Sequence, residues 1–286
     1  MSGNNNWRPY LLLAPALLVI GGLFGAGLLT GLLRSLSYMP VIGLTRPNLD
    51  AYHAVLTDPM FLRSFGLSLY ISVVSTLLSA LIAVPAALLL RRNFAGRGLV
   101  SFLFQLNLTV PHLVGAIGIL YLFSQSGSFA RLGFAAGLIS KPADFPALVF
   151  DPYAIGIILQ YVWKEVPFIG LIVLANLQSI GPDYEAVARS LGASRFQALR
   201  HVLLPLIAPG LAAAAVIVFA FTFGAYEIPL VLGANAPVTL PVLAYRSYTD
   251  TDLAARPQAM AMAMIIAALS GLMIALYLRA SRRGRV

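Results

Sequence analysis

Apolar residues are gathered into six long, uninterrupted runs that shorter polar segments separate. The runs cover approximately residues 10–33, 65–90, 99–123, 153–177, 206–232 and 259–278. Each reaches the roughly 20 predominantly apolar residues that an α-helix needs to cross a bilayer, and none alternates in polarity as barrel strands do. We therefore predict an all-α integral membrane protein with six transmembrane helices, which satisfy their own backbone hydrogen bonds in lipid. The whole chain, 1–286, is predicted to form one transmembrane domain.

Four prolines fall inside these runs, at Pro85, Pro111, Pro167 and Pro229. Each removes a backbone donor, so each is expected to kink its helix.

The first run is longer than the apolar region of a signal peptide, which has about 7 to 15 residues, and no small-residue cleavage site follows it. We therefore expect this run to remain as a helix and the mature chain to begin near Met1.

Charge is scarce and unevenly placed. Charged residues make up 10% of the chain and hydrophobic residues 59%, whereas soluble domains carry about 25% charged residues. Arginines gather beside alternate spans, at 8, 91, 92, 97, 189, 195, 200, 279, 282, 283 and 285. Positive loops stay on the cytoplasmic side, so both termini are predicted to be cytoplasmic. This topology accounts for the net charge of +9 without nucleic acid, and the absence of cysteine excludes disulfides and a cysteine nucleophile.

The predicted cytoplasmic segment 179–206 has the local signals of a helix, a turn and a second helix. Asp183 and Glu185 suit the positive end of a first helix, and Glu185 can pair with Arg189 four residues later. Gly192 is expected to end this helix in a left-handed conformation. Ser194 and Gln197 have the spacing of a capping box for the second helix, which Pro205 is expected to end.

The first of these helices carries an apolar face at Tyr184, Val187, Ala188 and Leu191. An apolar face in water needs a cover. It either packs beneath the protein's own helices or fills a groove on another protein. The segment alone does not decide between the two.

The run EAVARSLGASRFQALRHVLLP resembles the cytoplasmic signature of membrane subunits in binding-protein-dependent ABC importers. That signature reads Glu-Ala-Ala, three residues, Gly, nine residues, Ile, one residue, Leu-Pro. Gly192, Leu204 and Pro205 keep the spacing and Val202 replaces Ile, whereas the glutamate position falls on Ala186, one residue after Glu185. RPYLLLAPALL, RRNFAGRG, YVWKEVPF and FTFGAYEIPLVLG also resemble this family in order and position.

The resemblance implies a type I importer permease fold in the bacterial inner membrane, with alternating access to the solute. It implies that the loop between helices 4 and 5 is a coupling loop that docks on an ATP-binding subunit dimer through Glu185, Ala186, Arg189, Gly192, Ala193 and Ser194. The other implied partners are a sister permease, rather than a second copy, and an external solute-binding protein. The chain has no phosphate-binding loop, so ATP and magnesium are expected on the partner, and this subunit is predicted not to be an enzyme. The FGAYEIPLVLG and PVTLPVLAYR stretches lean toward importers of polyamines, iron or thiamine, with polyamine as the leading prediction.

Ionisable residues within the spans are costly in lipid and usually face protein or water. Glu227, with Tyr226, is a candidate for the translocation path and for a cationic solute; a buried pair or an outer-mouth carboxylate is an equal alternative. Lys164 and Glu165 project about 100 degrees apart on a helix and cannot both face one partner, so we interpret them as interhelical or inter-subunit anchors rather than ligands. His112 is interpreted as a structural histidine, because no second metal ligand stands at helical spacing.

Two other classes are weighed against the importer. An ion-gradient-driven secondary transporter commonly shows internal repeats with interrupted helices, and residues 1–143 and 144–286 show no clear repeat. An intramembrane enzyme needs clustered catalytic groups, which three scattered histidines and no cysteine do not supply.

Overall fold

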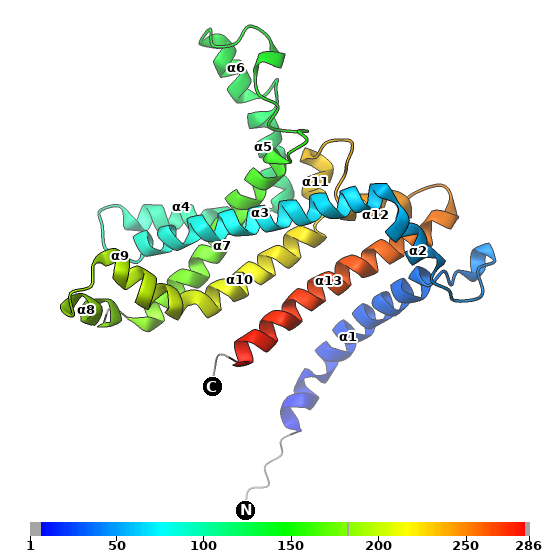
Figure 1. The fold of residues 1–286 in the computed structure, drawn as a ribbon, viewed down its shortest axis with the longest axis horizontal. Coiled ribbons are helices and arrows are strands. Elements are labelled where there is room, and N and C mark those ends of the chain that lie inside the picture. The colour runs from blue at the N-terminus through cyan, green and yellow to red at the C-terminus, as the bar shows by residue number, and fades with distance from the viewer. Residues whose placement is uncertain (1–6, 182, 284–286) are drawn as a thin grey trace, which may run out of the picture. The chain divides into compact units, whose positions relative to one another are not determined.

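The computed structural model describes residues 7–181 and 183–283, and these form helices joined by short loops (Figure 1). Two compact units make up the chain. One contains the residues up to Phe61 together with Leu243–Ile265, and the other contains Leu62–Val242 together with the residues from Ile266. The prediction of one permease domain over 1–286 stays a prediction.

The helices follow each other closely along the chain. In order they are α1 (Arg8–Ser35), η1 (Pro40–Ile42), α2 (Asp50–Thr57), α3 (Pro59–Leu90), α4 (Arg97–Thr109), α5 (His112–Phe123), α6 (Ser128–Ala135), η2 (Pro142–Asp144), α7 (Ile155–Ile180), α8 (Asp183–Ser190), α9 (Arg195–Ala198), η3 (Leu199–Leu203), α10 (Leu204–Gly224), α11 (Glu227–Leu232), α12 (Leu240–Tyr248), η4 (Leu253–Ala255) and α13 (Arg256–Arg283).

Six helical segments in the described part of the chain are long and apolar enough to cross a membrane. They are Pro9–Ser35, Pro59–Leu90, His112–Ala135, Ile155–Ile180, Arg195–Gly224 and Leu253–Ser281. The count agrees with the six runs of the sequence. The third segment differs from the predicted run 99–123, because it starts at His112 and reaches through α5 into α6.

The prediction of one continuous helix over 99–123 is wrong at its centre. The first half, α4, ends at Thr109, and α5 begins only at His112. Between them Val110 and Pro111 are extended, with ψ of 124° and 144°. The ring of Pro111 disfavours helical geometry for the residue before it, so the proline interrupts the helix rather than bending it.

The run 206–232 is interrupted as well. Helix α10 ends at Gly224, Ala225 is extended with ψ of 134°, and α11 starts at Glu227. Pro229 therefore lies in the first turn of α11, where a backbone N–H has no partner within the helix to lose. Pro85 and Pro167, in contrast, lie inside α3 and α7, which continue past them.

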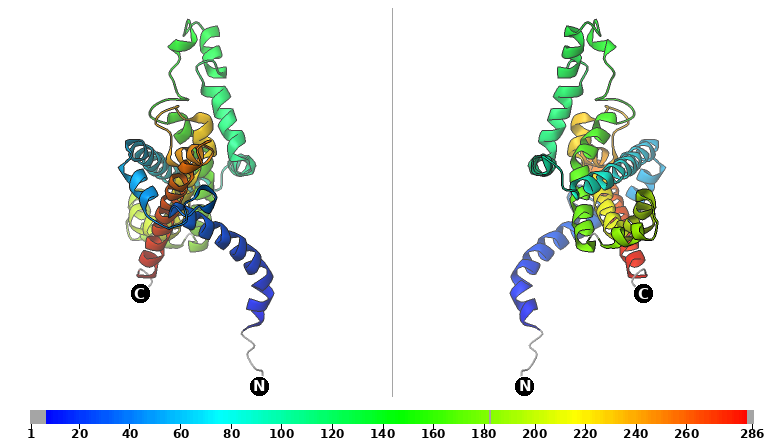
Figure 2. Two further views of the ribbon diagram at one scale, coloured as in Figure 1. Left: turned by 90° about the vertical axis from the view of Figure 1, so that its right-hand side faces the viewer. Right: turned by 90° about the vertical axis from the view of Figure 1, so that its left-hand side faces the viewer.

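Helix α7 is the centre of the larger unit. On one part of it, Ile169, Val173 and Leu177 pack with Ala83 and Ala87 of α3 and with residues of α10 in one apolar core. On the other part, Ile157 and Tyr161 pack with α5 and α11 in a second core. Figures 1 and 2 show α3, α7 and α10 side by side, while α6 stands apart from them at the far end of α5.

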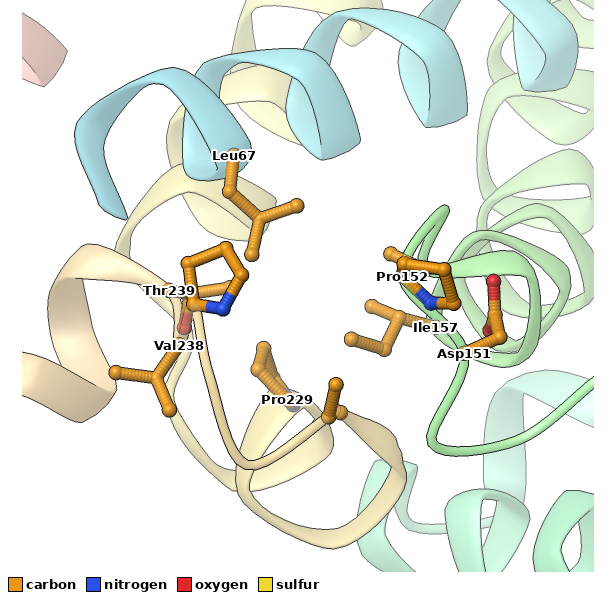
Figure 3. A pocket seen from close by; sticks show the side chains of 11 residues that line it. Leu67, Asp151, Pro152, Ile157, Pro229, Val238 and Thr239 are labelled. Atoms are coloured by element: carbon orange, nitrogen blue, oxygen red, sulfur yellow. The ribbon is translucent and has the colours of Figure 1, made fainter. Parts of the chain in front are cut away.

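The second core ends in a small cavity of about 10 Å³ (Figure 3), which Leu67, Ile157, Pro229 and Thr239 help to line. Its volume is close to the minimum that a single water molecule requires. Asp151, at its edge, is buried, and its carboxylate accepts hydrogen bonds from the backbone N–H groups of Tyr153 (2.9 Å) and Ile155 (2.9 Å). The cavity is therefore too small for a solute larger than water.

The smaller unit is held by contacts at the end of α1. The Ser35 hydroxyl shares a hydrogen bond of 2.9 Å with the Tyr52 hydroxyl of α2, and the Asn48 N–H donates to the Leu36 carbonyl at 2.8 Å. Earlier in α1, the large side chains of Leu12, Leu18 and Leu23 are exposed. Such a surface suits lipid or another membrane subunit.

Candidate functional site

The predicted coupling loop forms a compact helix, turn and helix. Gly192 has a φ of +91°, in the left-handed region, as predicted for the end of α8. The N–H of Ala193 donates to the Ala188 carbonyl and the N–H of Gly192 to the Arg189 carbonyl, each at 3.0 Å. These bonds satisfy carbonyls that the end of a helix otherwise leaves unpaired.

The capping box at the start of α9 is also confirmed. The Ser194 hydroxyl accepts from the Gln197 N–H at 3.2 Å, and the Gln197 amide oxygen accepts from the Ser194 N–H at 2.8 Å. The prediction that Pro205 ends this helix is wrong. A π-helical turn, η3, leads from α9 directly into α10, and Pro205 lies in the first turn of α10, where its missing N–H costs little.

Glu185 is held within the chain by Arg91 at the end of α3. Its Oε2 lies 3.3 Å from Nη1 of Arg91, and Nη2 of the same arginine donates to the Gly181 carbonyl at 2.7 Å. The predicted pair of Glu185 with Arg189 is therefore replaced by a contact between helices that are distant in sequence. Arg91 joins the α7–α8 turn to α3.

The apolar face of α8 is not covered by the described residues of this chain. Tyr184 and Val187 are exposed, and Leu191 is 84% exposed. Of the two readings that the sequence left open, packing beneath the protein's own helices does not occur. An uncovered apolar face of this kind is typical of a surface that binds another protein.

A second group of polar residues lies where α4 and α5 are interrupted. Lys164 of α7 is buried, and its ammonium donates to the carbonyls of Asn107 at 2.7 Å, Val110 at 2.6 Å and Leu108 at 3.4 Å. These carbonyls stand at the end of α4, where they have lost their helical partners. A cation also suits the negative end of a helix dipole.

Glu165, the next residue, reaches the start of α5 instead. Its Oε1 lies 3.4 Å from Nε2 of His112, and the Gln160 side-chain amide donates to the His112 carbonyl at 3.0 Å. Lys164 and Glu165 thus contact different helix ends, as their angular separation on α7 requires. Their role as anchors is consistent with these contacts and stays an interpretation.

Glu227 and Tyr226 stand at the second interruption, and both are exposed. One turn before the end of α10, Phe221 packs against His112 with ring centroids 4.8 Å apart. The two interruptions therefore lie close together in the larger unit, since residues near each of them touch. The role of Glu227 and Tyr226 in a translocation path stays a prediction.

Sequence reasoning missed several members of this group. Gln160 and Tyr161 are fully buried in α7, yet the Tyr161 hydroxyl and the side-chain amide oxygen of Gln160 lack hydrogen-bond partners among the described residues. Gln160 precedes Lys164 by four residues, a spacing that places both on one helix face and could have identified it. Nothing in the sequence marks Arg91 as the partner of Glu185.

Comparison with known proteins identifies relatives along most of the chain. Residues 75–285 match the family described as "Binding-protein-dependent transport system inner membrane component". A molybdenum transport system permease protein of Mycobacterium tuberculosis is 31% identical over 223 residues, which cover 76% of this chain and 80% of that relative. A sulfate transport system permease protein of Salmonella typhimurium is 27% identical over 235 residues, covering 82% of this chain and 81% of that relative.

The fold has a counterpart among solved structures. A chain of a bacterial alginate ABC transporter, crystallised with its alginate pentasaccharide-bound periplasmic protein, matches with a TM-score of 0.80 at 19% identity. The match covers 97% of this chain and 95% of that chain. It confirms the predicted fold class, an all-α membrane protein with the fold of an ABC importer permease.

Proposed function

Since this chain belongs to the family of binding-protein-dependent transport system inner membrane components, we propose that it forms the solute path of an ATP-driven importer by alternating access. Two arrangements of a permease dimer would exchange, each favoured by a different nucleotide state of the partner. ATP and magnesium would be bound by that partner. This subunit would carry no catalytic residue.

The observation that supports this proposal most directly is the uncovered apolar face of α8. It lies within the signature segment, next to a turn that Gly192 and the Ser194 capping box make rigid. A rigid loop with exposed apolar side chains suits a site where a partner protein binds and transmits its movement to this subunit. We propose that Glu185, Ala186, Arg189, Gly192, Ala193 and Ser194 form the coupling loop that docks on an ATP-binding subunit.

Movement of the docked loop would reach the membrane by two routes. One is covalent, because η3 continues into α10 without a break. The other runs through Arg91, which joins Glu185 and Gly181 to the end of α3. Since α3, α7 and α10 share one apolar core, a push on the loop would be transmitted to all three.

The proposed assembly contains an ATP-binding subunit dimer, a sister permease and an external solute-binding protein, with both termini of this chain cytoplasmic. The unpacked surface of α1 supports a lipid or permease contact. Separate partners are needed because this chain would contribute the solute path and has no phosphate-binding loop of its own.

For the solute we propose a small oxyanion such as sulfate or molybdate. The support is the likeness to the molybdenum and sulfate permeases, which do not support the polyamine prediction. A polyamine is the second candidate, because Glu227 presents an exposed carboxylate at the interruption between α10 and α11. Uptake of radiolabelled sulfate, molybdate, thiamine and spermidine by cells with and without the gene decides between them.

The coupling proposal is tested by purifying the tagged chain from its native membranes in mild detergent and identifying stoichiometric partners by mass spectrometry. The unaltered chain is expected to retain an ATP-binding subunit. Leu191→Glu is expected to lose it, because a charge would be buried in an apolar contact.

The matched control is Leu138→Glu, at a leucine that is 80% exposed in the segment after α6. This variant is expected to retain the ATP-binding subunit. Equal loss in both variants, or recovery of the unaltered chain alone, would overturn the proposal and favour the secondary-transporter alternative.

A further inference from the structure

A groove of about 710 Å³ lies between the end of α3 and the coupling loop, on the side away from the apolar face of α8. Glu185 and Arg189 of α8 line it, whereas Tyr184, Val187 and Leu191 point more than a quarter of a turn away on the same helix. The groove therefore lies on the other side of α8 from the apolar face, and it shares Glu185 and Arg189 with the loop proposed to dock on the ATP-binding subunit. Its volume is within the roughly 300–1,000 Å³ of ligand pockets.

The rim of the groove is strongly basic. Arg91, Arg92, Arg189 and Arg195 line it, and Glu185 is its one acidic lining residue among the described side chains. Arg91 is already engaged with Glu185 and with the Gly181 carbonyl. The guanidinium groups of Arg92, Arg189 and Arg195 form no hydrogen bond or ion pair within the described part of the chain. Three free cations at one groove attract an anion.

The floor of the groove is apolar. Leu88, Leu199 and Leu203 line it, and Phe196 is 67% exposed at its edge. A free inorganic anion gains nothing from such a floor, because it has no apolar surface to bury. A ligand that joins an anionic group to a hydrocarbon chain uses both parts of the groove.

The position of the groove along α3 identifies the source of such a ligand. Helix α3 is a candidate membrane span that ends at Leu90, and Arg91 and Arg92 follow it directly. Arginines directly after a span, on the side predicted to be cytoplasmic, are within reach of phospholipid headgroups. Basic grooves between helices on this side suit anionic headgroups.

We propose that the groove binds an anionic phospholipid, with the headgroup phosphate held by Arg92 and Arg195 and an acyl chain laid along Leu88 and Phe196. Arginine suits this task because its planar fork donates two hydrogen bonds to one phosphate. The bound lipid bridges α3 and the coupling loop and so supports the contact that Arg91 makes between them. The proposal rests on the orientation given under the proposed function.

The test uses the purified importer complex and two synthetic lipids with the same acyl chains, phosphatidylglycerol and phosphatidylcholine, titrated in detergent and counted by native mass spectrometry. The unaltered complex is expected to bind phosphatidylglycerol in clear preference. The double variant Arg92→Gln, Arg195→Gln is expected to weaken that binding about 25-fold, since each arginine near a membrane surface contributes about fivefold.

Two controls keep the result specific. Arg200→Gln removes an exposed arginine of the same loop that does not line the groove, and it should leave binding unchanged. Arg92→Lys with Arg195→Lys keeps both charges and should retain most of it. Equal binding of the two lipids, or equal loss in Arg200→Gln, would overturn the proposal.

Two alternative occupants are separated in the same preparations. Displacement of phosphatidylglycerol by millimolar sodium sulfate, but not by sodium chloride at equal ionic strength, would assign the groove to a free oxyanion instead. Loss of the ATP-binding subunit from the double variant, with lipid binding intact, would assign the arginines to the partner. Recovery of that subunit with the unaltered chain tests the proposed function separately.

Discussion

Helices α7 and α8 follow one another in the chain and invert the usual placement of side chains. In α7, 61% of the most apolar stretch is buried, and the buried set includes Lys164, Glu165 and Gln160. In α8 no residue is buried, and the apolar side chains of Tyr184 and Val187 stand exposed. Charges lie inside where lipid surrounds the protein, and apolar groups lie outside where water does.

The two helices differ in where these unusual side chains find partners. The buried charges of α7 find partners within the chain, because interruptions in neighbouring helices leave carbonyls and a histidine for them to contact. The apolar groups of α8 find no cover among the described residues, and on the proposed function another protein covers them. The fold itself satisfies the buried charges of α7, whereas on the proposed function assembly would bury the apolar face of α8.

The largest expected effect comes from Lys164→Met. The change removes the ammonium that donates to three carbonyls at the end of α4, and an unsatisfied buried polar group costs about 1–3 kcal/mol. We expect the variant to unfold at a clearly lower temperature, or to fail to accumulate, in thermal-unfolding assays of the detergent-solubilised protein. Lys141→Met, at the other lysine of the chain, should unfold like the unaltered protein, and equal unfolding of all three would show that the ammonium is not needed.

Gly192→Val is expected to have the next largest effect, in the coupling loop. A side chain at φ of +91° is strained, and left-handed geometry costs roughly 1–2 kcal/mol for an L-residue. Membrane insertion should be normal, while ATP hydrolysis by the reconstituted complex should lose its dependence on the loaded binding protein. Gly98→Val, in helical conformation at open space in α4, is the control, and normal coupling in Gly192→Val would count against the placement of the loop.

Glu185→Gln should modestly weaken the contact between the coupling loop and Arg91 at the end of α3. The pair with Arg91 is partly exposed, and such ion pairs contribute about 0.2–1 kcal/mol. We expect a small decrease in thermal stability and a larger decrease in solute-stimulated ATP hydrolysis. If stimulation is unchanged, the contact is not a transmission route.

Glu227→Gln should have the smallest effect on stability, because the carboxylate is exposed and makes no ion pair with a described residue. Its effect on transport separates the two solute candidates. Uptake of an oxyanion should be unchanged or faster, since a like charge is removed, whereas uptake of spermidine should decrease several-fold. A decrease in oxyanion uptake alone would contradict both assignments.

The parts of the fold that follow local rules could be predicted from the sequence. Six apolar runs predicted six membrane-crossing segments, and the turn at Gly192 and the capping box at Ser194 were predicted from residue type and spacing. These features depend on neighbours within a few residues, so short-range chemistry decides them.

The positions where helices are interrupted could not be predicted from local sequence alone. Pro111 interrupts its helix while Pro85 and Pro167 do not, although all three remove a backbone donor. The outcome depends on whether another helix supplies partners for the freed carbonyls, as Lys164 does for α4. Likewise the pairing of Glu185 with Arg91 joins residues 94 positions apart, and no local pattern contains such a contact.

The two interruptions divide two apolar runs of the larger unit into half-helices. Beyond Val110 and Ala225, the short helices α5 and α11 pack on each other and on the first part of α7, while α4 and α10, before the interruptions, pack on α7 as well. Extended residues connect the halves, and α7 contacts all four half-helices. On the proposed function, substitutions in α5 and α11 would change the solute path while the coupling loop keeps its sequence.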